Sequence, residues 1–128
     1  MNNSNEVVLL YNFDVEKLNK IKFVLIRMGI KIKMITKEYY LQSIGYLVGI
    51  KGFEKSDEIY IEEGFQEEML VMKGFSSSRI DELLKLLKKN GVQRIPLKAI
   101  ITEYNQSWNS IELYKELKEE HEQMTGNS

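Results

Sequence analysis

A run of hydroxyl side chains followed by a cation is the most suggestive polar cluster in the sequence. Soon after the apolar segment from Met69 to Met72 come three serines and an arginine, Ser76, Ser77, Ser78 and Arg79. Backbone N–H groups at a helix start, with hydroxyls and a guanidinium, suit an anion such as a phosphate or a carboxylate. The alternative interpretation is structural, because serines commonly cap helices and Ser78 with Asp81 makes a near capping box.

Asn12 and Asp14 form a second polar group, directly after the first apolar run, Val7 to Tyr11. Asp14 also suits the N-cap of the helix that follows. In an open parallel sheet, ligands bind beyond the carboxyl ends of the strands, where the strand order reverses. We therefore expect the loop with Asn12 and Asp14 to face the serine loop across a ligand crevice. Neither loop contains a GxxxxGKS/T or GxGxxG pattern, so there is no specific nucleotide-binding signal.

Four more candidates follow the last expected strand: Thr102, Tyr104, Asn105 and Trp108. They lie at the end of that strand where α/β domains place ligands. Trp108 has two interpretations, a platform for a ligand or part of an apolar helical stripe that packs in the core. The cap of the last helix also has two solutions, Asn105 alone or Asn109 with Glu112 in a capping box.

Reactive residue types are scarce. The chain has no cysteine and one histidine, His121, which has no carboxylate at a spacing that would assign it a catalytic partner. Lys98 lies in the apolar run from Ile95 to Ile101, and a desolvated lysine is able to act as a nucleophile or a base. Its place near a strand start favours a structural role instead, in which the stem is buried and the ammonium stays in water. We predict no catalytic residue, no metal ligand and no cofactor.

The elements that would position these residues form a repeated β-α-β-α pattern. Apolar runs at 7–11 and 69–72 predict strands, and apolar residues at helical spacing follow each run. Gly29 and Gly91 close these helices, as glycine commonly does. A shift of 62 positions superimposes the first strand and helix of each half, and the second strands correspond after a four-residue insertion. We therefore predict a duplicated unit, with halves at 6–50 and 68–124.

Strands that alternate with helices predict an α/β fold with a small, mainly parallel, four-stranded sheet and helices on both faces. The wholly apolar first and third strands suit the centre of this sheet. Lys31 and Lys33 in the second strand and Pro96 before the fourth mark edge strands. The expected order is 2-1-3-4. One alternative stays open, in which the halves meet as a pseudo-dimer with antiparallel central strands.

Residues 51–67 join the halves and are rich in aspartate and glutamate, with one interior lysine, Lys55. We call this segment the acidic connector. Its composition predicts an exposed loop, in which the segment from Ile59 to Ile61 is either a short strand or an anchor.

Composition indicates a single domain over residues 1–128. With 43% hydrophobic residues the chain is able to bury one core, and its net charge of -1 provides no field that recruits nucleic acid or an anionic membrane. No apolar run approaches the roughly 18 to 20 residues of a membrane span, and the polar start is not a signal peptide. We expect a cytoplasmic protein without a membrane or nucleic-acid partner.

A series of residues in the second half resembles a known bacterial family. The series comprises Leu70-Val71, Gly74-Phe75, Ile95-Pro96-Leu97-Lys98-Ala99, Thr102, Asn105, Trp108, Glu116-Leu117 and Glu119-Glu120-His121. Over about residues 69–121 it is similar to the family known as domain of unknown function 3783 (DUF3783). The resemblance implies a bacterial protein of uncharacterised role and supplies no reaction, cofactor or site residue. Glu103-Tyr104 departs from the proline that relatives often carry in this turn.

Two functions fit these observations. The first is a non-catalytic binding or regulatory module for a protein partner or a small anion, because no nucleophile, base and oxyanion constellation is present. The second is a small enzyme, or an enzyme subunit, that acts on a phosphate- or carboxylate-bearing metabolite between the loops at Phe13 and Phe75. A homodimer is compatible with either function, since two edge strands are lightly defended.

Overall fold

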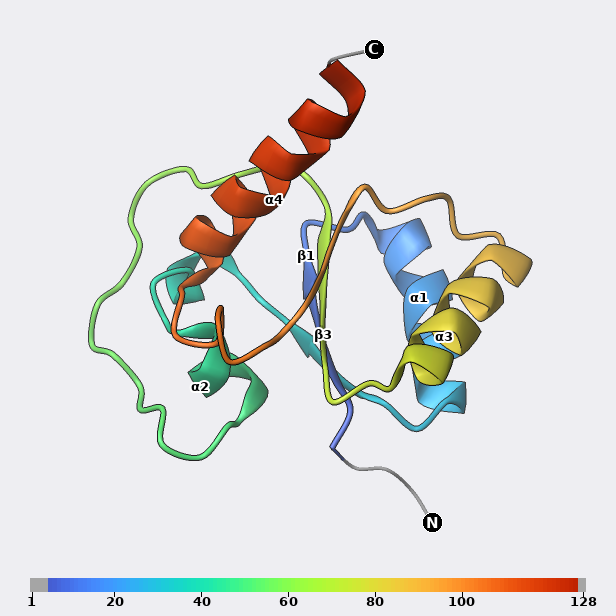
Figure 1. Ribbon diagram of the computed structural model, residues 1–128, viewed down its shortest axis with the longest axis horizontal. Helices are drawn as coiled ribbons and strands as arrows, with labels where there is room; N and C mark the ends of the chain where they lie inside the picture. The colour runs from blue at the N-terminus through green and yellow to red at the C-terminus, as the bar shows by residue number, and fades with distance from the viewer. Residues whose placement is uncertain (1–4, 127–128) are drawn as a thin grey trace.

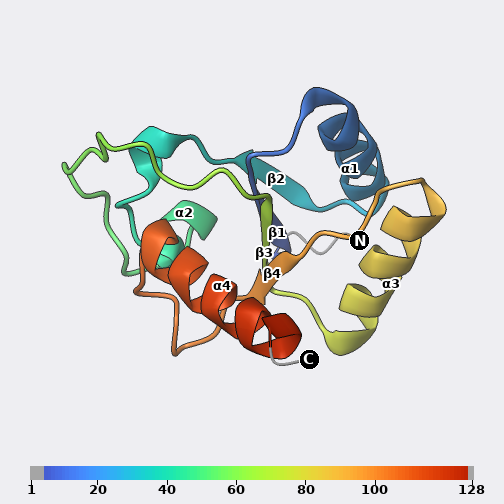
Figure 2. The same ribbon diagram turned by 90° about the horizontal axis from the view of Figure 1, so that it is seen from above.

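The computed structural model describes residues 5–126, in which a four-stranded sheet separates two layers of helices (Figure 1, Figure 2). The strands are β1 (Val7–Tyr11), β2 (Lys31–Met34), β3 (Met69–Lys73) and β4 (Leu97–Ile100). The helices are α1 (Val15–Arg27), α2 (Ile44–Val48), α3 (Ser77–Lys89) and α4 (Ser110–Gly126), with a short 3₁₀ turn η1 (Lys37–Tyr39) before α2. The predicted α/β class is confirmed.

The strand order is β2-β1-β3-β4, as the sequence predicts. The outer pairs β1–β2 and β3–β4 are parallel, so the sheet is mainly parallel. The central pair β1–β3 is antiparallel and has Leu9 opposite Val71 at its middle. The arrangement left open as an alternative, two halves that meet through antiparallel central strands, is therefore the one observed.

The central strands are buried on both faces, which explains why β1 is apolar at every position. Alternate side chains of β1 and β3 enter two separate cores. Val8, Leu10, Leu70 and Met72 pack against α1 and α3, whereas Leu9, Tyr11, Met69 and Val71 pack against α2, α4 and part of the acidic connector. Edge strand β2 exposes Lys31 and Lys33. No helix within residues 5–126 is long and apolar enough to cross a membrane.

The two halves are structural repeats. A shift of 62 positions carries the bounds of β1 and α1 onto those of β3 and α3, and a shift of 66 carries β2 onto β4. Ser43 and Asn109, which correspond under the second shift, pair with each other in an isolated antiparallel bridge. Corresponding residues therefore meet in the central strand pair and again where α2 and α4 begin. This arrangement is that of an approximate two-fold axis between the halves.

The acidic connector passes around the outside of α2 and reaches β3 beside α4 (Figure 1). Of the two interpretations of the segment from Ile59 to Ile61, an anchor is correct. Ile59 and Ile61 are exposed, while the Tyr60 ring lies 5.7 Å from the ring of Tyr40. Phe65, close to the end of the connector, is buried against Tyr40 and Tyr114. The connector is thus irregular but held by its aromatic residues.

The central strands end in equivalent left-handed turns. Asn12 has φ of 67° and its counterpart Gly74 has φ of 86°. At Gly74 an added Cβ would lie 2.4 Å from the backbone oxygen of Asn5, so this position also lacks space. Gly29 has φ of 74° with open space around it.

We predict that Gly74→Ala lowers the free energy of unfolding by about 3 kcal/mol, because backbone strain and a clash with Asn5 add together. Gly29→Ala should cost about 1 kcal/mol, since only the left-handed backbone is strained. Urea denaturation followed by circular dichroism measures both values. Equal losses for the two variants would contradict the clash at Gly74.

Candidate functional site

The antiparallel central pair divides the expected ligand crevice. The carboxyl ends of β1 and β2 lie together at one end of the strands, and the carboxyl ends of β3 and β4 lie at the other end. Asn12 follows the first pair, whereas the loop at Gly74 lies beside Asn5 at the start of β1. The expectation that these two loops face each other is therefore wrong. Its cause is the assumption that β3 runs parallel to β1.

The serine cluster has the contacts of a helix cap. The Ser76 hydroxyl accepts a hydrogen bond from the backbone N–H of Arg79 at 3.2 Å, and it also lies 3.2 Å from the Ser78 hydroxyl. Ser77 is the first residue of α3. At the start of α1, Asp14 makes the equivalent cap by accepting from the N–H of Lys17 at 2.9 Å. These side chains satisfy N–H groups that would otherwise lack a partner.

Arg79 is a structural cation. Its guanidinium donates to both carboxylate oxygens of the buried Glu6 at 2.7 and 2.8 Å, to the Met28 carbonyl at 3.0 Å and to Glu82 at 3.1 Å. These bonds join the start of β1, the end of α1 and the first turn of α3. The hydrogen bonds with Glu6 raise the pKa of Arg79. A guanidinium so fully used has little capacity left for a ligand.

Arg79→Met should lower the free energy of unfolding by about 3 kcal/mol, because it leaves the Glu6 carboxylate buried and unpaired. The matched control is Glu82→Gln, which removes the more exposed partner of the same arginine and should cost less than about 1 kcal/mol. Both values come from urea denaturation at neutral pH. A similar small loss for both variants would show that the pair with Glu6 contributes little.

The loop after β4 is stabilised by its own polar groups. The Asn105 side chain accepts from the N–H of Thr102 at 2.9 Å and donates to the Ile100 carbonyl at 3.2 Å. Thr102 Oγ1 accepts from the N–H of Tyr104 at 3.1 Å. Of the two proposed caps for α4, the box of Asn109 with Glu112 is the one present, with two reciprocal bonds of 2.9 Å.

Trp108 and Tyr104 differ in their surroundings, one packing in the core and the other lying exposed. Trp108 is partly buried and packs against the core on the α2 and α4 face, so the core interpretation describes it better. Tyr104 is 76% exposed and meets Trp108 edge-on, with ring centroids 5.2 Å apart. Tyr104 therefore remains available for contact with another molecule.

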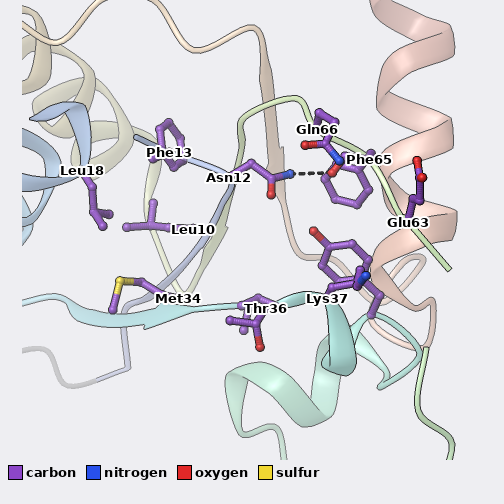
Figure 3. Close-up of a pocket in the computed structure, with 12 residues that line it drawn as sticks. Leu10, Asn12, Phe13, Leu18, Met34, Thr36, Lys37, Glu63, Phe65 and Gln66 are labelled. Atoms are coloured by element: carbon purple, nitrogen blue, oxygen red, sulfur yellow. Dashed lines mark hydrogen bonds between the residues drawn. The ribbon is translucent and has the colours of Figure 1, made fainter. Parts of the chain in front are cut away.

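A cavity of about 440 Å³ opens at the carboxyl ends of β1 and β2 (Figure 3). Here β1 leads to α1 on one face of the sheet, while β2 leads toward α2 on the other. This is a topological switch point within a parallel pair, the place where open α/β sheets hold ligands. We call the cavity the switch-point crevice. It lies between the first and second strands, not between the first and third as the sequence suggested.

The switch-point crevice has an apolar end and a polar end (Figure 3). Leu10, Phe13, Leu18 and Met34 form the apolar end. The side chains with polar groups in the lining are those of Asn12, Thr36, Lys37, Tyr40, Glu63 and Gln66, and Ile35 and Phe65 also line the crevice. The lining thus combines one cation, one carboxylate, neutral donors and an apolar floor.

Asn12 builds the wall of this crevice. Its left-handed backbone turns the chain away from β1, and its side-chain amide donates to the Phe65 carbonyl at 3.0 Å and the Glu67 carbonyl at 2.9 Å. These bonds hold the end of the acidic connector over the strand ends. Burial raises the pKa of Tyr40, whose hydroxyl also interacts with Asn12, so it stays protonated at neutral pH. Asn12 is the one candidate from the sequence that lines this crevice.

The connector is fixed from its other side by an ion pair with α4. Lys118 Nζ lies 2.7 Å from Glu67 Oε2 and 3.4 Å from the Tyr114 hydroxyl, and the Tyr114 ring stacks on Phe65 at 4.1 Å. The hydrogen bond from Lys118 lowers the pKa of Glu67 to about 2. The Glu67 side chain is 42% exposed, so solvent screening keeps the energy of this pair small.

The stability contributed by Glu67 should depend on pH. Because its pKa is lower in the folded state, the contribution is fully present above about pH 5 and is lost as the pH falls toward 2. Glu67→Gln should therefore cost up to about 1 kcal/mol at pH 7 and almost nothing at pH 2. Denaturation midpoints across this pH range measure the difference, with Glu62→Gln as the control. A cost of Glu67→Gln that is constant with pH would contradict the pairing.

The sequence did not point to Lys37, Glu63 or Gln66 as site residues. Glu63 and Gln66 belong to the acidic connector, whose path over β1 and β2 has no local sequence signal. Lys37 lies in η1, a single turn between β2 and α2. The sequence feature that could have predicted this arrangement is the repeat. Two similar halves, each with an apolar first strand, are suited to pair through those strands in an antiparallel, two-fold contact. Within residues 5–126, no group of three His, Asp or Glu side chains is placed to hold a metal ion.

Comparison with known families finds a match between residues 68–124 and the family described as domain of unknown function (DUF3783). The matched segment runs from just before β3 into α4, so it covers the second repeat, and the resemblance found in the sequence is confirmed. Searches of curated proteins and of solved structures found no match.

Proposed function

We propose, from the match of residues 68–124 to DUF3783 and the like topology of the first unit, that this protein is a non-catalytic binding module for a small carboxylate-bearing metabolite. The observation that carries this proposal is the lining of the switch-point crevice. It sets Lys37 and neutral hydrogen-bond donors at one end of a cavity whose other end is apolar. Sites for small molecules commonly combine an apolar floor with a few polar groups that orient the ligand.

Lys37 supplies the charge that would select an anion. Its side chain is exposed at the crevice and forms no ion pair with any residue between 5 and 126. Thr36 and Gln66 add a hydroxyl and an amide beside it. These groups match a carboxylate, because an ammonium and neutral donors together satisfy its oxygens.

Glu63 narrows the ligand class further. A carboxylate in the same lining would repel a simple anion but would attract the amino group of a zwitterion. The apolar end, with Leu10, Leu18 and Met34, is suited to an aliphatic or aromatic side chain. We therefore propose an apolar α-amino acid, or a close relative of one, as the ligand. The alternative of an enzyme acting between the Phe13 and Phe75 loops lacks a geometric basis, because those loops lie at opposite edges of the sheet.

Binding should weaken by about fivefold in Lys37→Gln, because an exposed charge pair contributes about 1 kcal/mol. The measurement is a titration of the methyl-labelled full chain with leucine, methionine and phenylalanine, followed by shifts of the Leu10, Leu18 and Met34 methyls. Lys55→Gln, on the exposed part of the connector, is the matched control and should leave the affinity unchanged. Absence of shifts at these methyls, or equal affinities for both variants, would contradict the proposal.

Glu63 allows a second comparison within the same titration. Leucine should lose affinity in Glu63→Gln, whereas 4-methylpentanoate, which lacks the amino group, should bind this variant at least as well as the parent chain. Binding of both ligands that is unchanged or tighter in Glu63→Gln would contradict the role of Glu63 in holding the amino group. A cytoplasmic location remains a prediction from the sequence, as do a protein partner at the Tyr104 surface and a homodimer through the edge strands.

A further inference from the structure

The two repeats differ at the connection between helix and second strand. In the first repeat, Gly29 and Ile30 lead directly into β2. In the second, Gly91 and Val92 are followed by four inserted residues, Gln93, Arg94, Ile95 and Pro96, before β4 begins. Both glycines have positive φ, 74° and 83°, so the helices end in the same way. The insertion is therefore a local addition to an otherwise repeated unit.

Three of the inserted residues, Gln93, Arg94 and Ile95, form one wall of a groove of about 540 Å³ between α3 and the edge strand β4. Its apolar lining comes from Leu84, Leu87, Val92 and Ile95, and its polar lining from Lys88, Gln93, Arg94 and Lys98. We call it the α3–β4 groove. It is separate from the switch-point crevice, with which it shares no lining residue. Its volume lies within the range of small-molecule sites, about 300 to 1,000 Å³.

The charges of the α3–β4 groove are of one sign. Lys88, Arg94 and Lys98 line it, and no carboxylate does. None of the three forms an ion pair with a residue in the described part of the chain. An apolar floor with three cations beside it is complementary to a molecule that has one anionic end and an apolar body.

Lys98 is placed to meet the anionic end. It pairs across the sheet with Leu70, whose side chain lies in the core on the α1 and α3 face, so Lys98 points to the α3 side of β4. Its side chain is partly buried, and Nζ donates to the Ile95 carbonyl at 2.5 Å. An ammonium has three N–H donors, so two remain after this bond. The inserted Ile95 thus holds the ammonium at the groove.

We propose that the α3–β4 groove binds a free apolar monocarboxylate of the medium-chain fatty acid class. The carboxylate lies between Lys98 and Arg94, and the hydrocarbon chain lies over Leu84, Leu87 and Val92. The carboxylate satisfies the remaining donors of Lys98, while the chain removes apolar surface from water. The first repeat lacks the inserted wall, so this site belongs to the second repeat alone.

Sodium decanoate, kept below its micelle-forming concentration, is the probe for this site. In a methyl-detected NMR titration of the full chain, the methyls of Leu84, Leu87, Val92 and Ile95 should shift together. Each added methylene should tighten binding about three- to fourfold, so decanoate should bind about tenfold tighter than octanoate. Decanol, the uncharged analogue, should bind at least about tenfold more weakly than decanoate.

Lys98→Met tests the anionic end, because methionine keeps an apolar stem and removes the ammonium. It should weaken decanoate binding about tenfold and leave decanol binding unchanged. Lys85→Met on α3, whose side chain does not line the groove, is the matched control and should alter neither. Amide spectra of both variants confirm that the fold is retained, and Arg94→Gln repeats the test if Lys98→Met does not fold.

Several outcomes would overturn this proposal. These are equal binding of decanoate and decanol, unchanged decanoate binding in both Lys98→Met and Arg94→Gln, or no shift of the groove methyls. Tighter binding of a short apolar peptide with a free C-terminal carboxylate would assign the groove to a protein partner instead. Lys37→Gln should leave decanoate binding unchanged, so failure here is distinguishable from failure of the amino-acid site.

Discussion

The antiparallel contact between β1 and β3 is the constraint on which the rest of the structure depends. Leu9 opposite Val71 sets the register, and every residue of β1 is buried. A slip of one residue would exchange the side chains that face the two cores, which makes this register strongly specified. Because β1 and β3 run in opposite directions, the carboxyl ends of the parallel pair β1–β2 lie at one end of the sheet. The carboxyl ends of the parallel pair β3–β4 lie at the other end.

The two-fold arrangement explains where the candidate sites lie and why they differ. Each half contributes a parallel pair with its own switch point, and the acidic connector lines the one at β1 and β2. Asn12 and the pair of Glu67 with Lys118 fix the end of that connector on opposite sides. The second half has instead a four-residue insertion, which builds a groove against α3. Two similar units thus acquire different surfaces through the segments added between their regular elements.

Much of the fold follows from local patterns. The continuous apolar runs, the closing glycines Gly29 and Gly91 and the lysines of β2 predict the element types, the strand order and the edges, and all of these are confirmed. The role of polar residues before a helix was ambiguous in the sequence, since serine and asparagine occur there both as helix caps and as ligand-binding residues. The contacts of Ser76, Asp14 and Asn109 are those of caps. The contacts of these three side chains are therefore explained by helix capping.

The sequence by itself determined the repeat, the helices and strands and which strands are central, because apolar periodicity and glycine placement act within a few residues along the chain. Only the tertiary structure decided the relative direction of β1 and β3, since an apolar strand satisfies its hydrogen bonds in either direction. That direction, with the path of the connector, brought Lys37 and Glu63 to one crevice and separated Asn12 from Arg79. The side chains around a site depend on long-range pairing, and such pairing has no local signature in residues 51–67.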